Sequence, residues 1–249
     1  MSAHTLVILP TYNEAENIAH VVERIRRSAA DVDILIVDDG SPDGTGDIAD
    51  AIADTDAAVH VAHRPGKSGL GAAYLYGFEW AALRGYEAVV ECDADGSHHP
   101  EELERLLSAL RTADVVVGSR WVPGGLVEDW PLSRRLLSQM GSAYARAALR
   151  LPQHDITGGY RAYRIAALER IRLDTIQSEG YCFQIEMLWR ARDAGLRIAE
   201  VPITFTERRR GASKMRGGIV IEAMWRVTLW GLQARIPRRP RSRTAPRHV

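Results

Sequence analysis

The chain has 249 residues, of which 46% are apolar and 26% are charged. This length allows one large α/β domain with a buried core, and the composition excludes an extended disordered chain. The formal net charge is zero, but it is unevenly distributed. Residues 205–249 carry twelve Arg or Lys against two acids, whereas residues 1–204 carry 20 bases against 30 acids. A basic end on an acidic body favours contact with phosphates, either of a membrane surface or of a substrate.

The first 120 residues alternate between apolar runs and helical segments. Continuous β-branched runs of this kind are typical of strands buried on both faces of a parallel sheet, and the alternation indicates βαβ units. Strands are predicted at 6–9, 34–37, 58–62, 88–90 and 115–117, and helices at 14–29, 69–84 and 100–111.

The second half of the chain follows a different pattern. Helices are predicted at 132–149, 181–194 and 218–234, and a strand at 197–204. Residues 235–249 contain six Arg, three Pro and no acid, which predicts a flexible basic tail.

Neither a disulfide framework nor a membrane span is expected. The two cysteines, Cys92 and Cys182, are too few for a framework and lack metal-finger spacing. The most apolar helical stretch, residues 219–232, contains Glu222 and Arg226 and is shorter than the roughly 18 apolar residues that a spanning helix needs. No signal peptide precedes the first apolar run, so we expect a cytoplasmic protein.

Polar residues follow four of the predicted strands. The four segments that follow the strands are Pro10-Thr11-Tyr12-Asn13-Glu14, Asp38-Asp39-Gly40-Ser41, Asp93-Ala94-Asp95-Gly96 and Gly118-Ser119-Arg120. Gly, Asp and Asn also favour plain turns, which is the alternative explanation. Because ligands of open parallel sheets bind beyond the carboxyl ends of the strands, we expect these four segments to converge on one site.

The pair Asp93 and Asp95 is the sharpest chemical feature. Residues two apart in an extended segment share a face, so both carboxylates can reach one ion. Mg²⁺ and Mn²⁺ prefer oxygen ligands, and Mg²⁺ is commonly held by one or two carboxylates plus substrate phosphates. Ser97 has the same parity and is a third candidate ligand, whereas His98 and His99 are either ligands or structural residues.

These motifs together resemble family 2 glycosyltransferases, and among them the polyprenyl-phosphate mannose synthases. The same order of motifs is continued by Pro42-Asp43-Gly44-Thr45 and by Arg208 with Gly211-Ala212-Ser213-Lys214. The resemblance covers about residues 4–230. It implies a GT-A fold, that is, a Rossmann-like, mainly parallel α/β sheet flanked by helices, with a C-terminal amphipathic helix. Residues 1–234 would form the catalytic domain, with a nucleotide-sugar half at about 1–120 and an acceptor half at about 121–234, followed by the tail at 235–249.

The reaction implied by the resemblance is an inverting, metal-dependent transfer of mannose from GDP-mannose to a polyprenyl monophosphate. The implied cofactor is Mg²⁺ or Mn²⁺. The enzyme would lie peripherally at the cytoplasmic face of a membrane, with or without a separate anchoring protein, and would have no nucleic-acid partner. One alternative is a glucosyl- or other family 2 transferase acting on the same lipid, and another is a non-catalytic nucleotide-sugar-binding subunit of a membrane complex. The missing GxGxxG fingerprint disfavours a dehydrogenase.

Residue roles are implied in the same way. The donor contacts would be Pro10, Tyr12, Glu14, Val37, Asp39, Asp93, Ala94, Asp95, Arg208 and Lys214. The metal ligands would be Asp93, Asp95 and Ser97, although many relatives have Gln at the position of Ser97. The acceptor phosphate would be bound by Arg120, Arg134 and Ser138, with Asp95 and Arg120 as the catalytic residues. Glu179 replaces a Lys that many relatives have.

The implied chemistry suits these residue types. A phosphate monoester has a second pKa of about 6, so the nucleophile needs no strong general base near neutral pH. It needs cations that bring two anions together and offset the charge of the leaving diphosphate. The planar fork of Arg binds phosphate with two parallel hydrogen bonds.

The helix predicted at 218–234 carries Trp225 and Trp230 and an i, i+4 pair of Glu222 with Arg226. Together with the basic tail it could lie at an anionic membrane interface. The alternative is that it packs on the core of the domain or on another subunit.

Overall fold

A computed structural model describes residues 4–176, 178, 180–207 and 217–233. Its centre is a sheet of seven strands: β1 (Thr5–Thr11), β2 (Asp33–Asp38), β3 (Val59–His63), β4 (Ala88–Glu91), β5 (Val115–Ser119), β7 (Arg161–Arg164) and β8 (Ile198–Pro202). The strand order is β3-β2-β1-β4-β7-β5-β8. β7 is antiparallel to both neighbours, and the other pairs in this sheet are parallel. A second sheet pairs β6 (Leu126–Glu128) with β9 (Thr204–Thr206).

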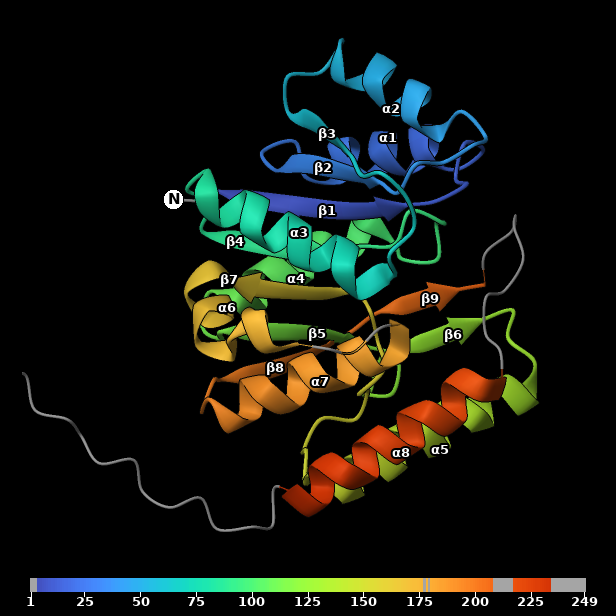
Figure 1. The fold of residues 1–249 in the computed structure, drawn as a ribbon, viewed down its shortest axis with the longest axis vertical. Helices are drawn as coiled ribbons and strands as arrows, with labels where there is room; N and C mark the ends of the chain where they lie inside the picture. Colours follow the sequence, from blue (N-terminus) through green and yellow to red (C-terminus); the bar gives the residue numbers. More distant parts are fainter. Residues whose placement is uncertain (1–3, 177, 179, 208–216, 234–249) are drawn as a thin grey trace, which may run out of the picture.

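The helices cover both faces of the central sheet (Figure 1). The described helices are α1 (Ile18–Ser28), α2 (Thr45–Ala53), α3 (Leu70–Leu83), α4 (Leu103–Leu110), α5 (Leu132–Leu149), α6 (Ile165–Ile171), α7 (Gly180–Asp193) and α8 (Gly217–Gln233). Short 3₁₀ turns at Pro100–Glu102 and Leu173–Thr175 complete the described elements.

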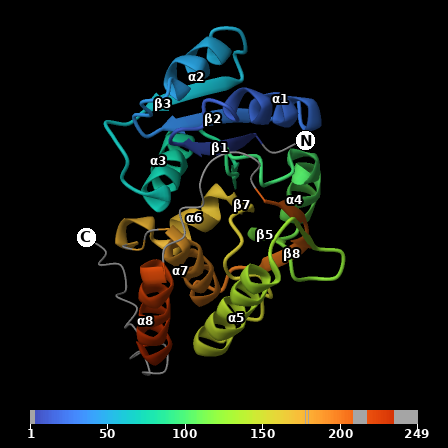
Figure 2. The ribbon, with the colours of Figure 1, turned by 90° about the vertical axis from the view of Figure 1, so that its right-hand side faces the viewer.

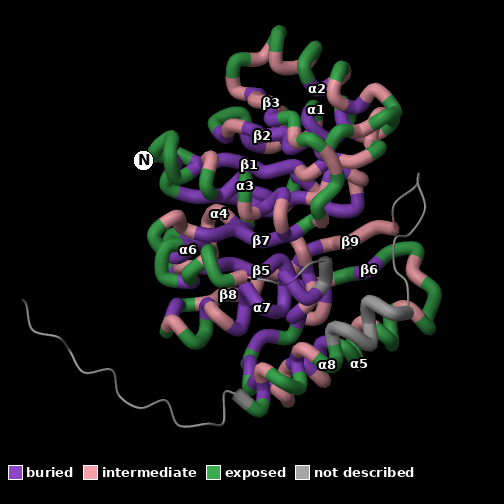
Figure 3. Tube along the Cα trace, viewed as in Figure 1, coloured by how far each residue is buried: buried purple, intermediate pink, exposed green. Residues whose placement is uncertain are grey.

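The buried core has a layer on each side of the sheet, and β1 shows why. Val7 and Leu9 join the cluster that includes α1 and α4, whereas Leu6 and Ile8 join the cluster that includes α3, α6 and α7. Side chains alternate between the faces of a strand, so a strand that is apolar throughout requires cover on both sides. The inner strands of the sheet are accordingly buried along most of their length, whereas the edge strands β3 and β8 are not (Figure 3).

The predicted α/β class with a mainly parallel sheet is confirmed, but β7, α2, α6 and the small sheet were not predicted. β7 was not predicted because it contains two arginines and is therefore not a continuous apolar run. Arg161 is fully buried, and its guanidinium donates to the carbonyls of Gly158, Gln184 and Ile156. These acceptors allow a charged residue to occupy the middle of the sheet.

Two predicted elements have different limits in the structure. The helix expected from residue 14 begins at Ile18. Residues 15–17 form a turn in which the Glu14 carbonyl accepts hydrogen bonds from the N–H groups of Asn17 and Ile18. The strand expected at 197–204 is divided into β8 and β9, which belong to different sheets.

α5 and α8 lie side by side beyond the β8 end of the sheet (Figures 1 and 2). The Tyr144 hydroxyl lies 2.6 Å from the Thr228 hydroxyl. A Cβ on Gly231 would come within 2.7 Å of the Ala148 carbonyl oxygen, so glycine is what permits this close approach. Trp230 stacks on Trp189 of α7 with ring centroids 5.7 Å apart. One face of α8 therefore packs on the domain itself, which supports the core-packing alternative for that face.

None of the described helices is both long and apolar enough to cross a membrane.

Candidate active site

The loops after β1 and β2 are tied together at the carboxyl edge of the sheet. The backbone N–H of Asn13 donates to the Ser41 hydroxyl at 3.0 Å, and that of Glu14 donates to the Thr45 hydroxyl at 2.9 Å. Asp38 is buried and accepts hydrogen bonds from Ser41, so it fixes the loop. This arrangement places Pro10, Tyr12 and Glu14 beside the loop that follows β2.

Asp39 lies in the same loop region and is only 5% exposed. Burial raises the pKa of the Asp39 carboxyl, and the nearby charge of Arg64 opposes that rise. The Arg64 guanidinium lies 3.2 Å from the Asp39 carboxylate, and the Lys67 ammonium lies 4.5 Å from the Tyr12 ring centroid. Arg64 and Lys67 were not among the predicted site residues, and they add positive charge where the predicted nucleotide contacts gather.

Two of the predicted donor contacts have packed side chains. Val37 is fully buried in the core layer of α3, and Ala94 is buried in the layer of α1 and α4. Any contact of either residue with a nucleotide would therefore involve its backbone.

The segment after β4 forms a tight loop around Asp93 and Asp95. Gly96 has a φ of 76°, which favours glycine, and the Ser97 N–H donates to the Asp95 carboxylate at 3.0 Å. The Asp93 N–H donates to Nδ1 of His98 at 3.0 Å. The two carboxylates are partly exposed, whereas Ser97 is 2% exposed and its hydroxyl has no hydrogen-bond partner among the described residues.

The two histidines act structurally. Because Nδ1 of His98 accepts a backbone hydrogen bond, the ring proton of the neutral form lies on Nε2, which leaves no lone pair for a metal. Burial lowers the pKa of His98 and favours this neutral form. His98 also stacks on Tyr160, and His99 hydrogen-bonds Thr206 at 2.8 Å. The structure therefore supports the structural alternative for both residues.

The carboxylate pair suits a hard cation that is completed by substrate oxygens. In the part of the chain that the structure describes, no group of three or more His, Cys, Asp or Glu residues could hold a metal by itself. Mg²⁺ and Mn²⁺ sites with one or two carboxylates and substrate phosphates need no such group. The residues present therefore fit a metal that binds together with a nucleotide diphosphate.

The Asp93 carboxylate has a buried neighbour on α3. The hydroxyl of Tyr74, a fully buried residue, lies 3.3 Å from Oδ1 of Asp93 and donates to it. Burial, reinforced by the Asp93 charge, raises the pKa of Tyr74 well above its ordinary value, so the phenol keeps its proton.

On the other side of the site, Arg120 follows β5 and is paired with Asp155. Nε and Nη2 of Arg120 donate to the two oxygens of Asp155 at 2.7 and 2.8 Å, and the Arg120 N–H adds a third bond at 3.0 Å. Burial alone would raise the pKa of Asp155, but the Arg120 charge and hydrogen bonds outweigh it and hold the pKa below its usual range. Asp155 reaches Arg120 because β7 is antiparallel, which brings the segment before β7 to the carboxyl edge of the parallel strands.

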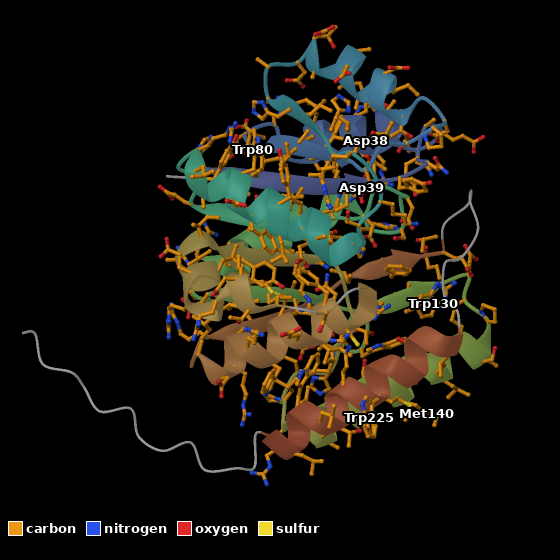
Figure 4. All side chains as sticks on the ribbon, viewed as in Figure 1. Asp38, Asp39, Trp80, Trp130, Met140 and Trp225 are labelled. Atoms are coloured by element: carbon orange, nitrogen blue, oxygen red, sulfur yellow. The ribbon has the colours of Figure 1, made fainter. Side chains whose placement is uncertain are left out.

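The rings of Trp130 and Phe205 connect the predicted acceptor arginines. The guanidinium carbon of Arg120 lies 5.5 Å from the Trp130 ring centroid, and that of Arg134 lies 4.2 Å from it. Trp130, which precedes α5 and is labelled in Figure 4, packs edge-on against Phe205 at 5.4 Å. Arg134 also forms an ion pair with Glu207. Ser138 lies one turn beyond Arg134 on α5.

Gly158 and Gly159 join the two sides. A Cβ on Gly159 would lie 3.9 Å from Oδ2 of Asp93, and a Cβ on Gly158 would lie 3.3 Å from the Asp155 carboxylate. The structure thus brings the predicted metal carboxylates and Arg120 to one site. Arg208, Lys214 and Glu179 lie outside the described residues.

Comparison with known proteins assigns this fold and site to a class. The family model of glycosyl transferase family 2 matches residues 6–172, and the chain belongs to that family. It is therefore a glycosyltransferase.

Two curated relatives are each 56% identical to the chain. One is named polyprenol monophosphomannose synthase, from Mycolicibacterium smegmatis, and is aligned over 237 residues, which are 94% of this chain and 89% of the relative. The other is named undecaprenyl-phosphate mannosyltransferase, from Micrococcus luteus, and is aligned over 230 residues, which are 92% of this chain and 95% of the relative.

Among solved structures, the chain resembles glucosyl-3-phosphoglycerate synthase from Mycobacterium tuberculosis in complex with Mn²⁺ and UDP-glucose. The TM-score is 0.63 at 20% identity, with 93% of this chain and 78% of that chain covered. A complex of the same enzyme with Mn²⁺, UDP and phosphoglyceric acid gives a TM-score of 0.64 at 23% identity, with the same coverage. These similarities confirm the GT-A type of fold.

Proposed function

We propose that this enzyme transfers mannose from GDP-mannose to a polyprenyl monophosphate, releasing GDP and inverting the anomeric configuration. The proposal is supported most directly by one juxtaposition. His98, which accepts the Asp93 N–H, and Trp130, whose ring lies near Arg120 and Arg134, both pack edge-on against Phe205. The names of the two 56%-identical relatives support mannose as the sugar and a polyprenyl phosphate as the acceptor.

The donor would bind at the loops after β1, β2 and β4. Tyr12 and Asp39 would receive the nucleoside, and Asp93 and Asp95 would hold a Mg²⁺ or Mn²⁺ ion with the diphosphate. When bound, the metal would neutralise charge that develops on the leaving diphosphate. The similar structures of glucosyl-3-phosphoglycerate synthase are complexes with Mn²⁺ and a uridine nucleotide, which supports a divalent metal as the cofactor.

The acceptor phosphate would be bound by guanidinium groups rather than activated by a base. Arg120 is rigid because its fork is fixed by Asp155, and Arg134 lies near the same Trp130 ring as Arg120. A phosphate monoester near neutral pH already carries a nucleophilic oxyanion. Direct displacement of the diphosphate by that oxygen would invert the sugar carbon. Asp95 is then a metal ligand and not a proton acceptor.

The lipid part of the acceptor would be delivered at a membrane surface. Eight exposed large apolar side chains lie on α5 and α8: Leu132, Leu136, Leu137, Met140, Met224, Trp225, Leu229 and Leu232. Figure 4 shows Met140 and Trp225 on these two helices. α5 carries three Arg and no acid, and it also carries the predicted acceptor residues Arg134 and Ser138. An apolar face with basic neighbours is suited to an anionic membrane interface, which supports peripheral attachment at the cytoplasmic face.

Donor choice is the experiment that tests the proposal. Purified enzyme is incubated with Mg²⁺, a short polyprenyl phosphate, and GDP-mannose, UDP-glucose or UDP-N-acetylglucosamine, and the lipid product is measured. Product from GDP-mannose supports the proposal. Product from only a UDP-sugar replaces it with the alternative transferase, and lipid product retained by Asp95→Ala would assign the activity to another protein and this chain to a binding subunit.

A further inference from the structure

The two arginines that meet at Trp130 are each already paired with a carboxylate, and the two pairs differ in burial. The Arg120 and Asp155 side chains are 7% and 0% exposed, whereas those of Arg134 and Glu207 are 20% and 31% exposed. In the part of the chain that the structure describes, the charges of these two arginines are therefore already balanced before a phosphate arrives.

Asp155 is held too firmly to leave Arg120. Besides the Arg120 bonds, its carboxylate accepts the Gly158 N–H at 2.9 Å, and its own N–H donates to Glu200 at 3.0 Å. Separating a buried pair leaves an uncompensated charge in a low-dielectric environment, which is strongly unfavourable. Arg120 therefore keeps its carboxylate partner when ligands bind.

Glu207 is held much less firmly. It directly follows β9, and its N–H donates to the Glu128 carbonyl at 3.3 Å. Its only ion-pair partner among the described residues is Arg134. Partly exposed pairs of this kind contribute little to stability, so water can replace the contact at small cost.

We propose that the Glu207 carboxylate occupies the acceptor-phosphate position on Arg134 and is displaced when the acceptor binds. This inference rests on the proposed function and deepens it, because it assigns different tasks to the two arginines. Carboxylate and phosphate both accept the paired hydrogen bonds of a guanidinium, and a phosphate monoester brings nearly twice the charge. In the acceptor-phosphate site, Arg120 keeps its carboxylate partner, whereas Arg134 exchanges the Glu207 carboxylate for the acceptor phosphate.

Trp130 is the positioning residue for this exchange. Its ring lies 4.2 Å from the Arg134 guanidinium carbon and is supported by Phe205. The attraction between a guanidinium and an indole face does not depend on Glu207. The ring therefore keeps Arg134 in place after the carboxylate has left.

The proposal predicts changes of opposite sign for two neighbouring substitutions. Glu207→Gln removes the competing charge but keeps the shape, and it lowers the KM and the Kd for a short polyprenyl phosphate by about two- to fivefold, as expected for a weak exposed pair. Trp130→Leu raises both constants by about three- to thirtyfold, the range of a cation–π contact, and Trp130→Phe restores much of the loss. Trp80→Leu, which removes another indole stacked on an arginine at 3.9 Å, leaves both constants unchanged.

Calorimetric titration of the full chain with the lipid phosphate, without donor, gives the Kd, and transfer assays give the KM. A Glu207→Gln enzyme whose acceptor affinity is equal to or lower than that of wild type overturns the proposal, as does a Trp130→Phe enzyme as weak as Trp130→Leu. If the wild-type enzyme binds the lipid phosphate but does not transfer mannose, the proposed function is contradicted. The proposed displacement of Glu207 is still tested in that case, because the variants raise or lower the Kd for the lipid phosphate whether or not transfer occurs. If Trp130→Leu does not fold, Glu207→Gln and Trp130→Phe still decide it.

Discussion

The buried pair of Arg120 and Asp155 allows a quantitative prediction for Asp155→Asn. The substitution keeps the size of the side chain but removes the charge that balances Arg120. Four donor contacts converge on this carboxylate, three from Arg120 and one from Gly158, at 2.7 to 3.0 Å. Removing one partner of such a buried pair costs about 3–5 kcal/mol of unfolding free energy. For a chain of this size that corresponds to a fall in Tm of about 6–20 °C.

The pH dependence of the same variant gives the prediction a second readout. The pKa of Asp155 in the native state lies below its ordinary value of 3.8. A depressed native pKa contributes stability that is fully present above the unfolded-state pKa and is lost as the pH falls through the native pKa. The difference in stability between wild type and Asp155→Asn should therefore be greatest near neutral pH and should narrow below about pH 4.

Urea unfolding followed by far-UV circular dichroism, at a series of pH values, measures this difference. A loss below about 1 kcal/mol at pH 7 would refute the reasoning, because it is the value of an exposed pair. A gap that stays constant as the pH falls would show that the carboxylate charge is not what stabilises this region. Asp50→Asn, at an exposed carboxylate near His63, is a control that should change stability little.

Three further predictions concern ligands. Tyr74→Phe should weaken Mn²⁺ binding with GDP about tenfold or more, without changing GDP binding in EDTA. Tyr163→Phe, in the same core layer, is the control and should leave Mn²⁺ binding unchanged. Electron paramagnetic resonance of Mn²⁺ measures the difference. Arg120→Ala should reduce transfer to the lipid phosphate far more than GDP binding, and equal loss of both would remove Arg120 from the acceptor site. Leu136→Ser with Met140→Ser should reduce sedimentation with anionic vesicles while the Tm stays within a few degrees of wild type, since both side chains are exposed; unchanged sedimentation would exclude this face from membrane contact.

Much of the fold could be predicted from the sequence, because its signals are local. The apolar runs of β1, β2, β4 and β5 are long enough to be recognised, and α5 has the predicted limits of 132–149. β7 could not be found in this way. Its arginines are stabilised in part by carbonyl groups that lie 23 to 54 positions away, at Gln184, Ala113 and Leu110, and no local pattern shows those partners.

The residues of the candidate site also differ in whether local sequence could predict them. Asp93, Asp95 and Arg120 follow predicted strands, so their convergence could be expected from topology. Asp155 and Glu207 could not be assigned, because they lie 35 and 73 positions from their arginine partners and pair with them only in the folded chain.

The tail at 235–249 remains a prediction that deletion can test. If it attracts the enzyme to anionic lipid, its removal should weaken sedimentation with anionic vesicles at low salt and leave folding intact. Unchanged sedimentation would show that the tail has no part in membrane contact.

The central claim is tested most directly by one assay: radiolabelled GDP-mannose and a short polyprenyl phosphate, with Mg²⁺, with Mn²⁺, or with EDTA. The proposed function predicts a labelled lipid phosphate product with either metal and its loss in EDTA. Absence of product from wild-type enzyme under both metal conditions, or undiminished product in EDTA, would contradict metal-dependent mannosyl transfer.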